Sequence, residues 1–183
     1  MPEPAKWVTD TSVYTHLCRA GHAAILQNLA PGGVILVPDD VDAEIKQGQE
    51  LYSGIPSLNE TTWAQLTVLT EDETDTQLAV KAAMGGDALK HLGECAVIAV
   101  AKHRGLTALI DERAAIAQAD RHSVTSRDTL WLVVEAYATI FNGDRARAVQ
   151  VVDDLLDTGM YLPISSGESL FVWAYQEQLL PRP

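Results

Sequence analysis

Short apolar stretches alternate with amphipathic stretches along most of this chain. The run Val34–Pro38 is continuously apolar and rich in β-branched residues, which is typical of a strand buried on both faces of a parallel sheet. Four further strands are predicted at Trp7–Thr9, Leu66–Leu69, Thr107–Ile110 and Ser123–Thr125. Strands that alternate with helices imply a parallel sheet with helices on both faces. We therefore predict an α/β fold, a three-layer α/β/α sandwich around a central, mainly parallel five-stranded sheet.

Helices are predicted where apolar residues recur at helical spacing between turn residues. Ser12 is the expected N-cap of the first helix, and the irregular stretch 48–62 is expected to form a surface loop. The expected helices cover residues 11–20, 22–30, 39–47, 71–84, 90–104, 113–121, 129–141, 146–157 and 168–180.

The length of 183 residues suits a single core. We expect a main domain over residues 1–160, with residues 161–183 as a helical extension packed on it. One predicted helix carries an apolar stripe at helical spacing, formed by Trp131, Val134, Tyr137, Ala138 and Phe141. Such a stripe suits packing against the tail helix or against a second copy of the chain, so we expect a homodimer.

The net charge limits the partners that the chain can bind. Lys and Arg number 13 against 25 Asp and Glu, which gives a formal charge of −12. This balance argues against a broad electrostatic grip on nucleic acid. It permits a metal site, because carboxylates that hold a cation are part of the negative count.

The cellular compartment follows from what the sequence lacks. Cys18 and Cys95 lie in apolar helical segments and are expected to be buried thiols in a reducing environment. The first ten residues do not show the basic-then-apolar pattern of an export signal. No run reaches the roughly 18 apolar residues that span a bilayer. We expect a cytoplasmic protein that does not contact a membrane.

Four acids are predicted to meet at one edge of the sheet. Asp10 and Asp111 each follow a predicted strand, and ligands of open parallel sheets bind beyond the carboxyl ends of the strands. Glu44 and Glu94 lie in the first turns of helices that start at the same edge. Clustered carboxylates must either take up protons or bind a cation. Oxygen ligands without His or Cys suit Mg²⁺ or Mn²⁺.

The order of these segments resembles that of the PIN-domain family. The segments are the strand before Asp10, then VPDDVDAEI with Glu44, LGECAVIAVA with Glu94 and LIDERAA with Asp111. The chain is similar to the bacterial branch with LGE and LIDE motifs, to which the VapC-type toxins are related. This resemblance implies Mg²⁺- or Mn²⁺-dependent cleavage of single-stranded RNA or of structured RNA loops.

The resemblance also implies roles for individual residues. Asp10, Glu94 and Asp111 would hold the metal, Glu44 would complete the acidic cluster, and Ser12 would form a hydrogen bond with it. Asp128 is either a fifth acid at the rim or only an N-cap. His91, three residues before Glu94, either supports that carboxylate or is a plain surface histidine.

Two interpretations of function follow. The first is an endoribonuclease toxin of a toxin–antitoxin pair, masked by a small antitoxin protein. The second is a PIN-fold protein with little or no activity that binds other proteins. The basic residues expected near the site-bearing edge, where they could contact RNA, are Arg19, Lys46, Arg113 and Arg127; each could equally be a solvated surface charge.

Overall fold

A computed structural model of the chain describes residues 7–181. Its strands are β1 (Trp7–Thr9), β2 (Ile35–Pro38), β3 (Ala64–Thr67), β4 (Thr107–Leu109) and β5 (Ser126–Arg127). They form one five-stranded sheet in the order β3-β2-β1-β4-β5, and each neighbouring pair is parallel. The predicted α/β fold with a central parallel sheet is confirmed.

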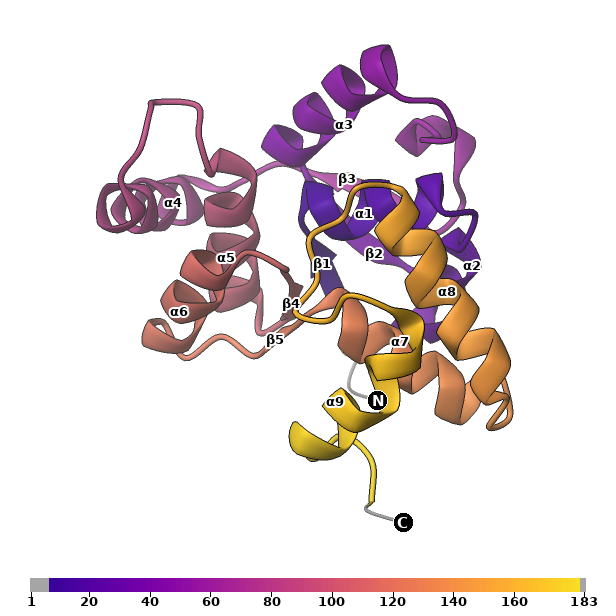
Figure 1. The fold of residues 1–183 in the computed structure, drawn as a ribbon. Helices are drawn as coiled ribbons and strands as arrows, with labels where there is room; N and C mark the ends of the chain where they lie inside the picture. The colour runs from indigo at the N-terminus through magenta and orange to yellow at the C-terminus, as the bar shows by residue number, and fades with distance from the viewer. Residues whose placement is uncertain (1–6, 182–183) are drawn as a thin grey trace.

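Helices flank the sheet on both sides (Figure 1). They are α1 (Thr11–Arg19), α2 (Ala23–Leu29), α3 (Asp39–Leu51), α4 (Glu71–Met84), α5 (Leu92–Arg104), α6 (Arg113–Arg121), α7 (Thr129–Thr139), α8 (Arg145–Asp157) and α9 (Leu170–Gln176). Helices α4, α5 and α6 lie on one side of the sheet, and α1, α2, α7 and α8 lie on the other. Short 3-10 helices occupy Pro31–Gly33, Leu58–Glu60 and Gly167–Ser169.

The hydrophobic core is formed by the sheet and by the inner faces of the helices on both of its sides. All four residues of β2 are buried, as expected for a central strand. Helix α5 is buried from Cys95 to Ala101, and every side chain in this stretch is small or β-branched. It ends at Gly105, whose left-handed φ of 64° suits glycine. None of the helices within residues 7–181 is both long and apolar enough to cross a membrane.

The apolar stripe on α7 packs partly against the tail of the chain. The rings of Tyr137 and Phe171 meet edge to face at 4.9 Å between centroids. Trp131 packs in the same manner on Trp7 of β1, at 5.9 Å. Ala138 is exposed. The stripe is therefore used largely within the chain itself.

Several predicted boundaries were wrong. Asp10, and not Ser12, caps α1, because its carboxylate accepts the Val13 N–H. Helix α3 continues to Leu51 through Gly48, so the predicted loop 48–62 is partly helical. The last strand is Ser126–Arg127, three residues later than predicted.

Smaller differences concern helix ends. Helix α5 starts two residues later than predicted, α7 ends two residues earlier, and the tail forms a 3-10 turn followed by the short α9. The predicted absence of an export signal rests largely on residues 1–6, which lie outside the described part, as do residues 182–183 of the predicted extension.

Candidate metal site

Asp10 and Asp111 lie side by side at the carboxyl ends of β1 and β4. These two strands are neighbours in the sheet, with Thr9 opposite Leu109. The backbone N–H of Asp111 donates to Oδ2 of Asp10 at 3.3 Å. Two acids that are 101 positions apart in sequence therefore share one point of the sheet edge, as predicted from their places after the strands.

Asp10 is the most deeply buried acid of this group, with 2% of its surface exposed. Its Oδ1 accepts the Val13 N–H at 2.8 Å, so the start of α1 fixes the carboxylate. Burial raises the pKa of Asp10 well above its usual value, and repulsion from Asp111 and then from Glu94 raises it further. The site thus holds negative charge that lacks compensation within the fold.

Asp111 is held from the other side by the first residue of α7. Its Oδ1 accepts the Thr129 N–H at 2.8 Å, and its Oδ2 accepts the Thr129 hydroxyl at 2.9 Å. Burial raises the pKa of Asp111 to about 6, and repulsion from Asp128 adds to it. The bonds from Thr129, and then from Ser12, act in the opposite direction. Ser12 thus lies close to Asp111 and lowers its pKa, although it does not cap the helix.

Glu44 reaches the site because residue 93 is a glycine. Its carboxylate accepts the Thr11 hydroxyl and, at 3.2 Å, the Gly93 N–H at the start of α5. A Cβ on Gly93 would lie 2.8 Å from Oε2 of Glu44, so any side chain there would displace the carboxylate. Burial raises the pKa of Glu44, and repulsion from Glu94 and then Asp40 contributes. The glycine of the LGE motif thus makes room for an acid from α3.

Glu94 stands between the other acids in the first turn of α5. Its side chain is 21% exposed, and its charge raises the pKa of both Asp10 and Glu44. Nδ1 of His91 lies 3.6 Å from Oε1 of Glu94. His91 precedes the helix as its N-cap residue, with a left-handed φ of 65°. Of the two interpretations of His91, the structure favours the one in which it accompanies Glu94.

Repulsion between neighbouring charges links the four predicted acids in a chain from Asp111 through Asp10 and Glu94 to Glu44. Even so, no three His, Cys, Asp or Glu side chains within residues 7–181 are arranged to hold a metal ion. The chemistry of the donors fits Mg²⁺ or Mn²⁺, since all four are carboxylates and two have strongly raised pKa values. Asp10, Glu94 and Asp111 are the residues that could hold such an ion.

Asp128 serves as the N-cap of α7 and also lies close to the site. Its Oδ1 accepts the Trp131 N–H at 2.7 Å. Its charge raises the pKa of Asp111, and burial raises the pKa of Asp128 itself. Asp128 and Asp111 line the same cavity of about 340 Å³, together with Arg113. The two roles considered for this residue are therefore compatible.

Of the four basic residues expected near the site, two line cavities at its rim and two make contacts elsewhere. Arg113 lines the cavity beside Asp111, and Arg127 lines an adjoining cavity of about 150 Å³. Arg19 instead stacks over the ring of Tyr52 at 3.8 Å, and Lys46 pairs with Asp42 at 2.5 Å.

Sequence reasoning missed three residues that position the acids. Thr11 and Gly93 hold Glu44, and Thr129 holds Asp111. Gly93 could have been found, because it directly precedes Glu94 in the LGE segment. Nothing in the sequence pattern links Thr129 to Asp111, since their contact depends on β5 lying beside β4.

The acids gather at the carboxyl ends of the central strands, which is where the ligands of open parallel sheets bind. Comparison with protein families agrees: residues 6–170 match the family DUF3368, described as a PIN domain. The chain belongs to the PIN-domain family, whose members are generally nucleases and usually bind divalent metals. A search of curated proteins found no match.

Proposed function

We propose that this protein is a metal-dependent endoribonuclease that cleaves single-stranded RNA. The observation that carries the proposal is the pair of Asp10 and Asp111 at the carboxyl ends of adjacent central strands, with Glu94 and Glu44 next to them. Membership of the PIN-domain family supports the same reaction class.

The chain's own groups would hold the acids in place for the reaction. The Val13 N–H fixes Asp10, Thr129 fixes Asp111, and Gly93 fixes Glu44. Asp10, Glu94 and Asp111 would hold Mg²⁺ or Mn²⁺, and Glu44 would complete the cluster. A divalent ion bound there would stabilise the negative charge that develops on the phosphodiester during in-line displacement.

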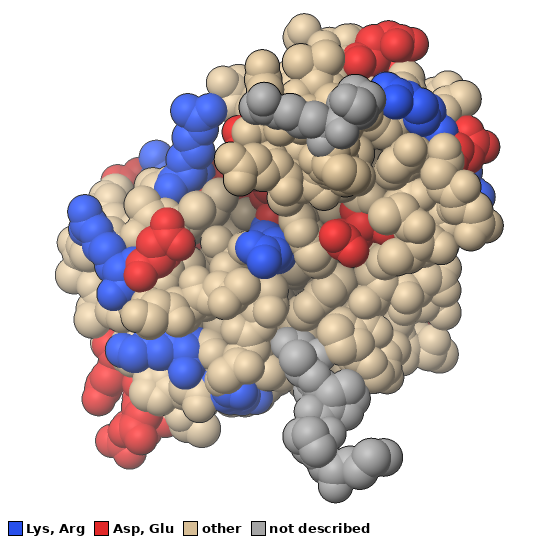
Figure 2. All heavy atoms as spheres, turned by 90° about the horizontal axis from the view of Figure 1, so that it is seen from below, with Lys and Arg blue, Asp and Glu red and all other residues tan. Residues whose placement is uncertain are grey.

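Binding of RNA must overcome the overall negative charge. Figure 2 shows Lys and Arg side chains, mixed with acids, on the left of the face in view, the side on which α4, α5 and α6 lie in Figure 1. Arg113 at the start of α6 is the positive group that lines the cavity at Asp111. Such a limited positive surface suits a short single-stranded segment better than a long duplex.

The biological setting that we propose is a toxin–antitoxin pair. A small antitoxin protein would mask the acidic edge, and the toxin would form a homodimer. The family match supports a nuclease core for such a toxin. A short gene overlapping the upstream end of this one would agree with the pairing, and sedimentation of the purified chain would measure the dimer.

A second candidate is a PIN-fold binding protein with weak or no activity. It is favoured by the lack, within residues 7–181, of three side chains already placed around a metal, and by the net charge of −12. In that case, protonation of Asp10 and Asp111, instead of a bound cation, would relieve the cost of burying their charges.

Calorimetry with Mg²⁺ and Mn²⁺, followed by cleavage assays on single-stranded RNA, separates the two candidates. The wild type is compared with Asp10→Asn/Asp111→Asn and with Glu168→Gln, an exposed acid that lies outside the site. Loss of both binding and cleavage in the double variant alone would support the nuclease. A wild type that binds no metal would refute the metal site. Binding without cleavage would refute the RNase activity and leave the binding protein.

A further inference from the structure

A cavity of about 340 Å³ opens directly beside Asp111. One wall is the start of α6, with Arg113 and Ile116, and the opposite wall comes from the tail of the chain, with Tyr161, Trp173 and Glu177. Ligand-binding pockets in proteins commonly measure about 300–1,000 Å³, so the cavity has room for a nucleotide. It is separate from the larger cavity of about 460 Å³ beside Arg19, which none of the four acids lines.

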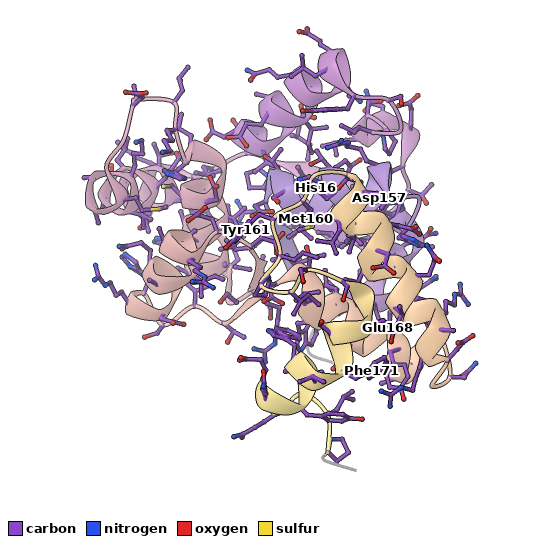
Figure 3. The ribbon with its side chains drawn as sticks, in the orientation of Figure 1. His16, Asp157, Met160, Tyr161, Glu168 and Phe171 are labelled. Atoms are coloured by element: carbon purple, nitrogen blue, oxygen red, sulfur yellow. The ribbon has the colours of Figure 1, made fainter. Side chains whose placement is uncertain are left out.

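Two aromatic side chains of the tail border this cavity, and Trp173 also packs against the hydrophobic core. Tyr161 is 86% exposed, and Trp173 is half-buried. Figure 3 shows Tyr161 on the segment between α8 and α9, directed toward the side of α5 and α6, whereas Phe171 lies near α8 and serves the core. Exposed aromatic rings next to a nuclease site are suited to stacking on unpaired bases.

The charges around the cavity decide which part of a nucleotide fits it. Arg113 is accompanied by three acids other than Asp111, namely Glu112, Asp128 and Glu177. Such surroundings repel phosphate and favour groups that carry N–H donors. Glu112 and Asp128 already accept backbone N–H groups as helix N-caps. Glu177 has no such capping role, because it follows the end of α9, so its carboxylate is available to a ligand.

We infer that this cavity holds one unpaired RNA base, guanine in preference to uracil, next to the bond that the acidic site cleaves. The inference rests on the proposed nuclease function. Guanine presents N1–H and N2–H₂ side by side and can donate to both oxygens of the Glu177 carboxylate. Uracil offers a single N–H between two carbonyl oxygens, which a carboxylate repels. The ring would stack on Tyr161 or Trp173.

The two tail residues that define the cavity lie outside the part of the chain that matches the family. The match ends at residue 170, and Trp173 and Glu177 come after it. This wall of the cavity therefore combines Tyr161 from the matched part with Trp173 and Glu177 from beyond it. Base preference is expected to depend on the tail, while bond cleavage depends on the four acids.

Binding of GMP and UMP, which carry the same phosphate and differ only in the base, is measured by ligand-observed NMR without metal and tests the cavity independently of RNA cleavage. We expect GMP to bind at least about fivefold more tightly than UMP, since a good bidentate contact is worth about that much. Glu177→Gln should abolish the preference, and Tyr161→Ala should weaken GMP binding by about fivefold or more. Trp173→Ala should act likewise, and Trp173→Phe should restore stacking if the alanine variant is poorly folded.

Matched controls come from residues outside the cavity. Glu168→Gln removes the same charge from the tail, and Figure 3 shows Glu168 away from Tyr161. Tyr52→Ala removes a half-exposed tyrosine near Arg19. Equal binding of GMP and UMP to the wild type, or the same effect from Glu168→Gln as from Glu177→Gln, would overturn the inference.

The cleavage pattern separates this inference from the proposed function. On a uracil-rich RNA with one guanine, the wild type should cut next to the guanine, and Glu177→Gln should cut without that preference. Cleavage at every position by the wild type, with no GMP binding, would refute the base pocket and leave the nuclease. Binding of GMP without any cleavage would refute the nuclease and the substrate role of the pocket.

Discussion

Replacing Asp111 by asparagine tests whether the acidic site destabilises the metal-free fold. Burial is the main cause that raises the pKa of Asp111 from 3.8 to about 6. Asparagine has nearly the same shape and can keep both bonds to Thr129: its amide oxygen accepts the Thr129 N–H, and its amide group donates to the Thr129 hydroxyl oxygen. The substitution therefore removes a charge and little else.

The sign of the effect follows from proton binding. The folded protein binds the Asp111 proton more tightly than the unfolded chain does. Protonated Asp111 therefore stabilises the folded state fully below about pH 4, and this stabilisation is lost as the pH rises through about 6. A shift of about two pKa units corresponds to about 3 kcal/mol. In EDTA at pH 7.5, Asp111→Asn should therefore be more stable than the wild type by up to about 3 kcal/mol.

Urea unfolding of both proteins at pH 4 and pH 7.5 in EDTA measures this difference. The gain should be present at pH 7.5 and nearly absent at pH 4. Glu168→Gln, which removes an exposed charge away from the site, should change stability by less than about 0.5 kcal/mol at both pH values. An Asp111→Asn variant that is no more stable than the wild type at pH 7.5 would refute the reasoning.

Three further outcomes are expected. Mg²⁺ or Mn²⁺ at about 100 times its Kd should raise the unfolding free energy of the wild type by about 2.7 kcal/mol. The same ion should raise that of Asp10→Asn by much less, and thermal melts with and without the ion measure both effects. Arg104→Ala should cost about 3 kcal/mol in urea unfolding, because Glu73, whose side chain is 2% exposed, loses its partner at 2.6 Å. Gly167→Ala should cost about 1–3 kcal/mol, because a Cβ there would lie 2.2 Å from the Val149 carbonyl oxygen.

Each of these outcomes has its own control. A metal effect of equal size in Asp10→Asn would place the ion elsewhere. Arg104→Lys keeps the positive charge and should recover part of the loss, so an equal loss in both variants would contradict the ion-pair argument. Gly48→Ala inside α3 meets only Ile55 at 3.5 Å and should be neutral or stabilising, in contrast to Gly167→Ala.

The sequence was sufficient to predict a parallel five-stranded sheet and the meeting of Asp10 and Asp111 at its edge. Asp10 and Asp111 were predicted from one rule, that residues after parallel strands meet at a common edge, and the pairing of β1 with β4 brings them together. The LGE segment predicted Glu94 in the first turn of α5. These predictions worked because they needed only local patterns and the general geometry of a parallel sheet.

The errors arose where tertiary contacts override local preference. Gly48 suggested a helix end, but packing keeps it inside α3. Ser123 ends the turn after α6 with a left-handed φ of 58°, and Val124 is buried in the core before the last strand starts. The bond between Asp111 and Thr129 likewise depends on how α7 docks beside β4.

That bond bears on the order in which the protein is made. A chain that grows from its N-terminus contains Asp10, Glu44, Glu94 and Asp111 before it contains Thr129, the residue whose N–H and hydroxyl orient the last of these acids. During translation, the four carboxylates are present before the donors that fix Asp111. Until α7 has emerged and docked, Asp111 lacks the two donors that orient it in the folded protein.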